Sequence, residues 1–377
     1  MTLLFSPIEL RTSTVRNRIG MSPMSMYSAI EGRVGVLDAA HYGARAIGGT
    51  GLVFTGTVAV SPEGRITPRD PGLWEDGQVA GLCQISEVVR AAGGTPAIQI
   101  GHAGRKASTS APWHGGEPRS EGRSLGDDEG GWPTLAPTAL AFGGNRPKVP
   151  AELATDAIQR IVADFATAAE RADRAGFDAL ELHGGHGYLL HEFYSPLTNQ
   201  RGDEYGGSFE NRVRFPLEVV RAIRRVWPEG KPLAFRLTVD DFVTGGWGPE
   251  DGLALAKQLV AEGVDLLDLM SFGGLTPEAE VPWDRNFTAE HGRRFKEAFS
   301  DTAIAVSAQT APAYDTPAAD IARLVDEGAA DIVLLGRQLL TDPHYAAHAA
   351  TALGHEDPLL PSNYEHWLTG RPSSHEF

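Results

Sequence analysis

The chain has 377 residues, 42% apolar and 22% charged, which is the composition of an ordinary globular protein and excludes a disordered or fibrous one. Its formal net charge of −16 (49 acidic against 33 basic residues), with no basic run, argues against a nucleic-acid partner. Cys83 is the only cysteine, which excludes intrachain disulfides and a four-thiolate iron–sulfur cluster and favours a reducing, cytoplasmic setting.

The N-terminal stretch MTLLFSPIEL has no basic region ahead of its apolar residues, so no export signal is expected. No later apolar stretch approaches the roughly 18 residues that are needed to span a bilayer. Residues 3–11 are expected to form a hairpin that closes one end of the fold.

Short apolar segments typical of buried strands then alternate with longer amphipathic stretches. Eight such segments follow in chain order: RIGMSPM (18–24), GLVFTGTVAV (51–60), PAIQIGH (96–102), DALELHG (178–184), LAFRLTV (233–239), LLDLMSF (266–272), AIAVSA (303–308) and DIVLLG (331–336). Between them, residues 152–175 show helical apolar spacing, and 249–262 opens with proline and acidic residues as helices do. The alternation predicts one α/β domain over residues 1–377, a (β/α)8 TIM barrel. A doubly wound sheet would instead carry a glycine-rich phosphate loop after its first strand, where this chain has SPMSMY.

Two segments depart from the alternation. Residues 107–150, rich in Gly, Pro and Ser, follow the third predicted strand. They are either a disordered surface loop or a lid over the barrel mouth, and we favour the lid because Trp113 and Trp132 supply apolar surface worth burying. Residues 355–377 form a C-terminal tail.

Barrel enzymes carry their chemistry at the C-terminal ends of the strands. The most informative of these ends is HGGHGY at 183–188, where His183 and His186 stand three residues apart beside glycines that allow close backbone approach. The pair could bind a metal, hydrogen-bond a carbonyl or oxyanion, or be purely structural. No carboxylate is prominent at the first five strand ends, so metal binding is disfavoured.

The remaining strand ends favour an anionic cofactor. Strands seven and eight are the usual phosphate position of barrels, and Gly336 followed by Arg337 suits close approach and bidentate pairing. The alternative is an ordinary strand-to-helix turn with a surface arginine. Gln99 and Arg236 are expected to point into the barrel. A buried arginine needs an anion to answer it, and a cofactor with a phosphate tail and a polar ring would satisfy all of these groups together.

Several longer motifs resemble the Old Yellow Enzyme family of flavoproteins, especially its bacterial xenobiotic-reductase and thermophilic-type ene reductases. They are NRIGMSPMSMYS, SPEGRIT, IQIGHAGRK, ELHGGHGYLLHEFYSPLTNQRGDEYGGSFENRVRF and LLGRQLLTDP, in the family's order and over nearly the whole chain. The resemblance implies a TIM barrel with one bound FMN that reduces activated alkenes at the expense of NAD(P)H in a ping-pong cycle. It also implies a homodimer or homotetramer acting on small molecules.

The resemblance also assigns residues. The histidine pair would bind the substrate's electron-withdrawing oxygen, Tyr188 would donate the proton, and Tyr27 would contact the substrate. The residues implied to bind FMN are Ser22, Pro23, Met24, Ser25, Thr57, Gln99, Arg236, Ser307, Ala308, Gly336 and Arg337.

Three positions depart from the branch pattern. Ser25 stands where a flavin-tuning cysteine is usual, Ser307 lies where glycine is usual, and NYEHWLTGR replaces a YER-like motif whose arginine would enter a neighbouring subunit. Two other functions stay open: a flavin-binding barrel with little reductase turnover, and a barrel lyase without flavin, which would require a Schiff-base lysine or metal carboxylates.

Overall fold

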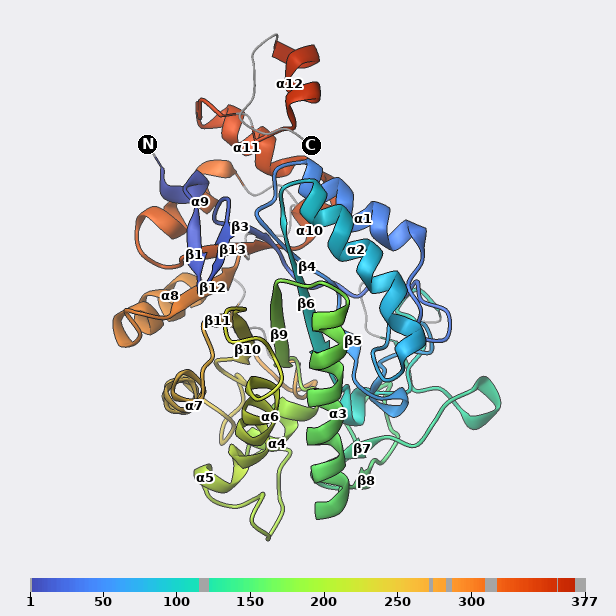
Figure 1. Cartoon of the computed structure of the whole chain (residues 1–377). Helices are drawn as coiled ribbons and strands as arrows, with labels where there is room; N and C mark the ends of the chain where they lie inside the picture. The colour runs from blue at the N-terminus through green and yellow to red at the C-terminus, as the bar shows by residue number, and fades with distance from the viewer. Residues whose placement is uncertain are drawn as a thin grey trace.

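The computed structural model describes residues 2–114, 122–270, 274–282, 287–308, 317–357 and 359–369. Within these ranges eight parallel strand positions close into a barrel, with helices on the outside (Figure 1). The ring consists of β3 (Ile19–Met21), β4 (Leu52–Phe54) with β5 (Val58–Ala59), β6 (Thr95–Gly101), β9 (Ala179–Gly184), β10 (Leu233–Thr238), β11 (Leu266–Met270), β12 (Ala303–Ser307) and β13 (Ile332–Leu335). Pairing of β13 with β3 closes it. The predicted (β/α)8 barrel is confirmed.

The second predicted strand, 51–60, is divided. Both β4 and β5 pair with β6, and Thr55–Thr57 lie between them. The chain passes very close to the end of β3 at this point, because a Cβ placed on Gly56 would lie 2.4 Å from the carbonyl oxygen of Met24. This close approach interrupts the strand and brings Thr57 beside the residues that follow β3.

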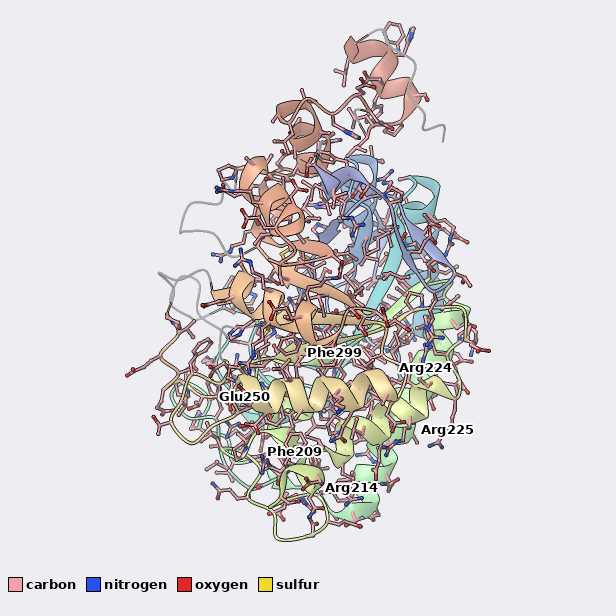
Figure 2. The ribbon with its side chains drawn as sticks, turned by 90° about the vertical axis from the view of Figure 1, so that its left-hand side faces the viewer. Phe209, Arg214, Arg224, Arg225, Glu250 and Phe299 are labelled. Atoms are coloured by element: carbon pink, nitrogen blue, oxygen red, sulfur yellow. The ribbon has the colours of Figure 1, made fainter. Side chains whose placement is uncertain are left out.

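The helices cover the barrel and present apolar stripes to it. In α3 the buried residues Ile158, Ile161 and Phe165 recur at three- and four-residue spacing, as expected for an amphipathic helix. Figure 2 shows α6, which carries Arg214 and Arg224, beside α7, which carries Glu250 in its first turn. The helices are α1 (Val36–Ile47), α2 (Val79–Ala91), α3 (Thr155–Arg174), α4 (Leu189–Tyr194), α5 (Phe209–Arg212), α6 (Arg214–Arg224), α7 (Pro249–Ala261), α8 (Phe287–Ala298), α9 (Ala318–Asp326), α10 (Arg337–Thr341), α11 (Tyr345–Ala352) and α12 (Ser362–Thr369), with 3₁₀ turns η1 (Leu3–Phe5), η2 (Pro62–Gly64), η3 (Asp76–Gln78), η4 (Gly104–Lys106) and η5 (Asp127–Glu129).

An N-terminal hairpin plugs one end of the barrel. It consists of β1 (Ile8–Leu10) and β2 (Ser13–Val15), so the predicted position at 3–11 is shifted. Residues 3–5 form η1 instead, because Leu4 and Phe5 pack into the outer core. The inner core joins hairpin and strand residues: Leu10, Val15, Leu52, Phe54, Ala97, Ala179, Ala234, Leu266, Ala305, Ile332 and Leu334.

The insertion at 107–150 lies on the opposite side of the barrel from the hairpin, where its short strand β7 (Leu135–Ala136) pairs with β8 (Ala151–Glu152), which directly follows the insertion (Figure 1). Phe142 packs its ring 5.0 Å from Lys106 Nζ, and the indole N–H of Trp132 donates to the Glu63 carbonyl at 2.9 Å. Trp113 lies 5.8 Å from Tyr27 but remains 60% exposed, so the expectation that it buries apolar surface is wrong. Residues 115–121 of the insertion lie outside the described ranges.

The C-terminal tail carries α12, which stands away from the barrel in Figure 1. Trp367 on this helix is 85% exposed. Arg371, the last residue of the segment NYEHWLTGR, lies outside the described residues. No helix in the part of the chain that the structure describes is long and apolar enough to cross a membrane.

Candidate active site

The HGGHGY segment lies at the C-terminal end of β9, as predicted. His183 is in the strand, and Tyr188 is the residue that precedes the first turn of α4. His183 Nε2 and His186 Nδ1 are 3.1 Å apart, and the Tyr188 ring meets the His183 ring edge to face at 4.8 Å. The three predicted side chains therefore form one cluster at the barrel mouth.

The backbone of this segment is held in an unusual conformation. His186 has φ +57°, which is uncommon for a residue with a side chain, and Gly187 has φ +70°. A Cβ at Gly187 would lie 2.3 Å from the Gly274 carbonyl oxygen, so only glycine fits. The buried Lys106 ammonium donates to the carbonyls of His186 and Gly274 at 2.8 and 3.0 Å. These contacts fix the direction of the His186 ring.

Both histidines are neutral. Burial lowers the pKa of His183 well below its ordinary value, with the positive charges of Arg236 and Lys106 acting in the same direction. Burial also lowers the pKa of His186, and His183 and Arg236 add to the effect. The Gly185 N–H donates to His183 Nδ1 at 3.3 Å, which assigns the His183 proton to Nε2 and that of His186 to its own Nε2. The cluster can thus offer the His186 Nε2–H to an oxygen without protonating it, while the His183 Nε2–H is bonded to His186 Nδ1.

A buried set of polar groups that sequence reasoning missed supports the same loop. The Gly187 N–H donates to His191 Nδ1 at 2.9 Å, and His191 Nε2 donates to Asp241 at 2.7 Å. Asp241 also accepts from the Ser195 hydroxyl at 2.7 Å. His191 was visible in the motif LLHEF, but Asp241 comes fifty positions later, and only the fold brings it near.

Glu192, the neighbour of His191, is a fully buried acid beside the site. Its carboxylate accepts from the backbone N–H of Arg105 at 2.9 Å. Burial raises its pKa to about 8, although Arg105 and Lys106 act in the opposite direction. Glu192 is therefore mostly protonated at neutral pH and carries no charge into the site.

We expect Glu192→Gln to make the protein less sensitive to rising pH. The folded protein keeps a proton that the unfolded chain releases between about pH 4.5 and 8, so the unfolding free energy of the native protein falls across this window. Glutamine accepts the same hydrogen bond and has no proton to lose. Melting curves should show the variant gaining stability relative to the native protein toward the upper end, with the exposed Glu297→Gln as control. A constant difference between the two proteins would contradict this explanation.

Beneath the histidines lies a layer of polar side chains inside the barrel. Thr57 donates to the Gln99 carbonyl oxygen, and the Gln99 amide donates to Glu181 at 2.7 Å. Arg236 donates to the hydroxyls of Ser22 and Ser307 at 3.0 and 3.3 Å. Inward-pointing Gln99 and Arg236 are thus confirmed.

The protein itself supplies an anion beside Arg236. Asp268 forms an ion pair with it, with Arg236 Nε 3.0 Å from the Asp268 carboxylate. Asp268 and Glu181 lie within strands, each directly beside its partner residue on the neighbouring strand. Neither acid lies at a strand end, where the functional residues were predicted.

The remaining predicted residues also gather at this mouth. Tyr27 and Tyr188 pack against the same small cluster of Ile66, Ala103 and Ala107. The backbones of the first and eighth strands meet, since the Ser22 N–H donates to Leu335 and a Cβ on Gly336 would lie 3.4 Å from the Met24 sulfur. The Ala308 N–H donates to Leu334, and Arg337 is exposed. The strand-end residues in question are Ser22, Pro23, Met24, Ser25, Ser307, Ala308, Gly336 and Arg337.

The described residues contain no group of three or more His, Cys, Asp or Glu side chains placed to hold a metal ion. What the mouth offers is a set of neutral and cationic hydrogen-bond donors above a parallel barrel. An α/β barrel with this donor set at its mouth is suited to binding an electron-rich or anionic group.

Residues 3–356 match the NADH:flavin oxidoreductase / NADH oxidase family, and the chain belongs to it. The family predicted from the sequence motifs is thereby confirmed. The NADPH dehydrogenase of Bacillus subtilis is 38% identical over 364 residues, 96% of this chain and 98% of that protein. The protein is therefore an NAD(P)H-dependent oxidoreductase with FMN as its cofactor.

Solved structures agree with this assignment. Morphinone reductase superimposes with a TM-score of 0.74 at 29% identity, covering 93% of this chain and 90% of that one. A 2-naphthoyl-CoA reductase, solved with 2-naphthoyl-CoA, shares the fold with a TM-score of 0.81 at 24% identity. This chain spans only 53% of that larger protein.

Proposed function

We propose that the protein is an ene reductase, which uses NAD(P)H and FMN to reduce activated C=C bonds in enones, enals, maleimides and nitroalkenes. The observation that carries the proposal is the cluster of two neutral histidines and Tyr188 at the barrel mouth. It supplies donors for the electron-withdrawing oxygen and, beside them, a phenolic proton. NAD(P)H and the alkene would occupy the same pocket in turn, in a ping-pong cycle.

The residues present fit FMN. Arg236 would lie beside the polar edge of a flavin ring inside the barrel, and Thr57 and Gln99, which are hydrogen-bonded to each other, would contact the ring. The ring would be lined by Ser22, Pro23, Met24 and Ser25. Gly336 has no side chain to block a phosphate, which Arg337 and the backbone at Ser307 and Ala308 would hold. When bound, FMN takes a hydride from NAD(P)H and delivers one to the alkene, chemistry that no side chain supplies.

The protein's own groups would polarise and protonate the substrate. The His186 Nε2–H, joined by the His183 Nε2–H when it turns from His186 Nδ1 to the substrate, would hydrogen-bond the carbonyl or nitro oxygen, on which negative charge develops as the alkene is reduced at Cβ. Because both rings are neutral, they stabilise this charge without transferring their protons. Tyr188 would give its phenolic proton to Cα and regain one from solvent. Tyr27, which packs against the same apolar cluster as Tyr188, would contact the substrate.

Turnover in D₂O with unlabelled NADPH and 2-cyclohexenone tests the proposed reaction. One saturated ketone should form for each NADPH consumed, with deuterium at Cα and none at Cβ, and denatured protein should release FMN. NADPH oxidation that is indifferent to the enone would instead support a flavin-binding barrel with little reductase turnover.

We expect Ser25→Cys to shift the reduction potential of bound FMN and its charge-transfer absorption with phenols. A thiol that is partly thiolate in an electropositive site interacts with the ring differently from a hydroxyl. Anaerobic redox titration measures the shift. The control for an added thiol is Ser6→Cys, in the N-terminal segment before β1. An unchanged potential in fully loaded Ser25→Cys protein would show that position 25 does not tune the flavin.

The proposal extends to the setting of the enzyme. The single cysteine supports a cytoplasmic location, and the contacts of the 107–150 insertion with Lys106 and Tyr27 support its role as a lid on one FMN-binding domain. The exposed Trp367 and Leu368 on α12 support assembly into a homodimer or homotetramer. Light scattering of the purified protein tests the assembly.

A further inference from the structure

A layer of buried charged and polar side chains lies inside the barrel, between the apolar core at the hairpin end and the mouth. Four side chains, Gln99, Glu181, Arg236 and Asp268, are all at most 2% exposed. The Gln99 amide donates to Glu181 at 2.7 Å, and Arg236 Nε lies 3.0 Å from Asp268. The Glu181 and Asp268 carboxyl groups interact electrostatically, and Glu181 Oε2 and both Asp268 carboxylate oxygens are buried without a hydrogen-bond partner among the described residues. The layer thus links strands β6, β9, β10 and β11.

This layer holds two carboxyl groups and one guanidinium. Burying a second, unanswered carboxylate in such a site is far more costly than protonating it. Two interacting acids of this kind titrate as a pair and not as separate groups. One negative charge and one proton on the pair leave the layer neutral.

The surroundings indicate which acid holds the proton. Burial raises the pKa of Glu181 well above its ordinary value, and the charge of Asp268 raises it further. Burial raises the pKa of Asp268 as well, but Arg236 and the neighbouring Glu181 oppose this. These directions, together with the contact between Arg236 and Asp268, favour Asp268 as the ionised acid and Glu181 as the acid that keeps its proton.

We propose that Glu181 and Asp268 share a single negative charge that cancels the charge of Arg236, and that this cancellation sets the reduction potential of the bound FMN. The inference rests on the proposed position of Arg236 beside the flavin. Both acids act through Arg236 and are positioning residues. Reduction adds negative charge next to the guanidinium, so an Arg236 without its counter-charge would favour the reduced cofactor and raise the potential.

A double-mutant cycle on the FMN-loaded protein tests the shared charge. Glu181→Gln replaces a neutral group by a neutral one and should leave the potential nearly unchanged. Asp268→Asn should also change it little, because Glu181 then ionises in place of Asp268. The double variant removes the charge altogether and should raise the potential by at least about 30 mV, a tenfold change in the ratio of reduced to oxidised FMN.

The expected result is strong non-additivity, which a merely structural role would not produce. Asp265→Asn is the matched control, since Asp265 pairs with Arg11 where β11 begins, away from the barrel mouth. Its potential should equal that of the native protein. A double variant whose shift equals the sum of the single shifts would overturn the proposal.

Infrared difference spectra give a second measurement that does not depend on the flavin or on the double variant. A protonated-carboxyl band should appear in the difference between native protein and Glu181→Gln, and also between native protein and Asp268→Asn. Its absence from the first difference would overturn the shared proton. Arg236→Gln distinguishes a wrong flavin position from a failure of this inference alone. An unchanged potential in Arg236→Gln would mean that the proposed flavin position is wrong. A lowered potential in Arg236→Gln, together with an unchanged potential in the double variant, would mean that only this inference fails.

Discussion

His183→Ala and His186→Ala are each expected to slow alkene reduction about 100-fold and to weaken phenol and enone binding. Removing one preorganised donor from an oxyanion site typically costs about 2.7–4 kcal/mol. An enone belongs at the lower end, because its developing charge is delocalised. Each substitution affects both donors, since His183 Nε2 is bonded to His186 Nδ1 and loss of either ring releases the other.

Stopped-flow measurement of the two half-reactions separates this role from a structural one. Hydride donation from NAD(P)H needs no bond to the substrate oxygen, so reduction of the flavin should be much less affected than its reoxidation by the enone. His348→Ala, on the exposed surface beside Asp342, is the control. Normal phenol binding and normal alkene reduction in the double His183/His186 variant would return the pair to a purely structural role.

Tyr188→Phe is expected to keep ligand binding and to impair protonation. The ring contacts with His183 and with the apolar cluster remain, because phenylalanine preserves the ring and loses only the hydroxyl. A positioned general acid contributes roughly 10²–10⁴-fold, so turnover of an enone should fall within that range. Nitroalkenes should be affected far less, since they can leave as nitronates without protonation at Cα.

The comparison of two substrates makes this prediction specific. Turnover of 2-cyclohexenone and of a nitroalkene is measured with native protein, Tyr188→Phe and Tyr364→Phe, the last on the exposed α12. Equal losses for both substrates in Tyr188→Phe would mean that the tyrosine positions the substrate and does not donate the proton.

The barrel and the main cluster were predictable because both depend on local pattern. Apolar strand segments separated by helices define the fold, and the end of a strand places its residues at the mouth. HGGHGY could therefore be assigned to the site before any contact was known. The helix over 152–175 was predictable for the same reason, from the spacing of residues such as Ile158 and Phe165.

What the sequence did not reveal depends on register and on contacts between distant segments. Glu181 and Asp268 lie inside apolar strands. Glu181 is beside Gln99 and Asp268 is beside Arg236 only because of which strands are neighbours in the barrel. Asp241 reaches His191 only through the fold. The break in the second strand at Gly56 and the exposure of Trp113 are likewise set by packing, which composition does not encode.

Anaerobic mixing of the dithionite-reduced protein with 2-cyclohexenone isolates the alkene reaction from NAD(P)H and oxygen. An ene reductase should recover the absorption of oxidised flavin as the enone is consumed and form one saturated ketone per flavin, and this recovery should be about 100-fold slower in His186→Ala. Flavin that stays reduced in the presence of the enone and reoxidises only when oxygen is admitted would contradict the proposed function.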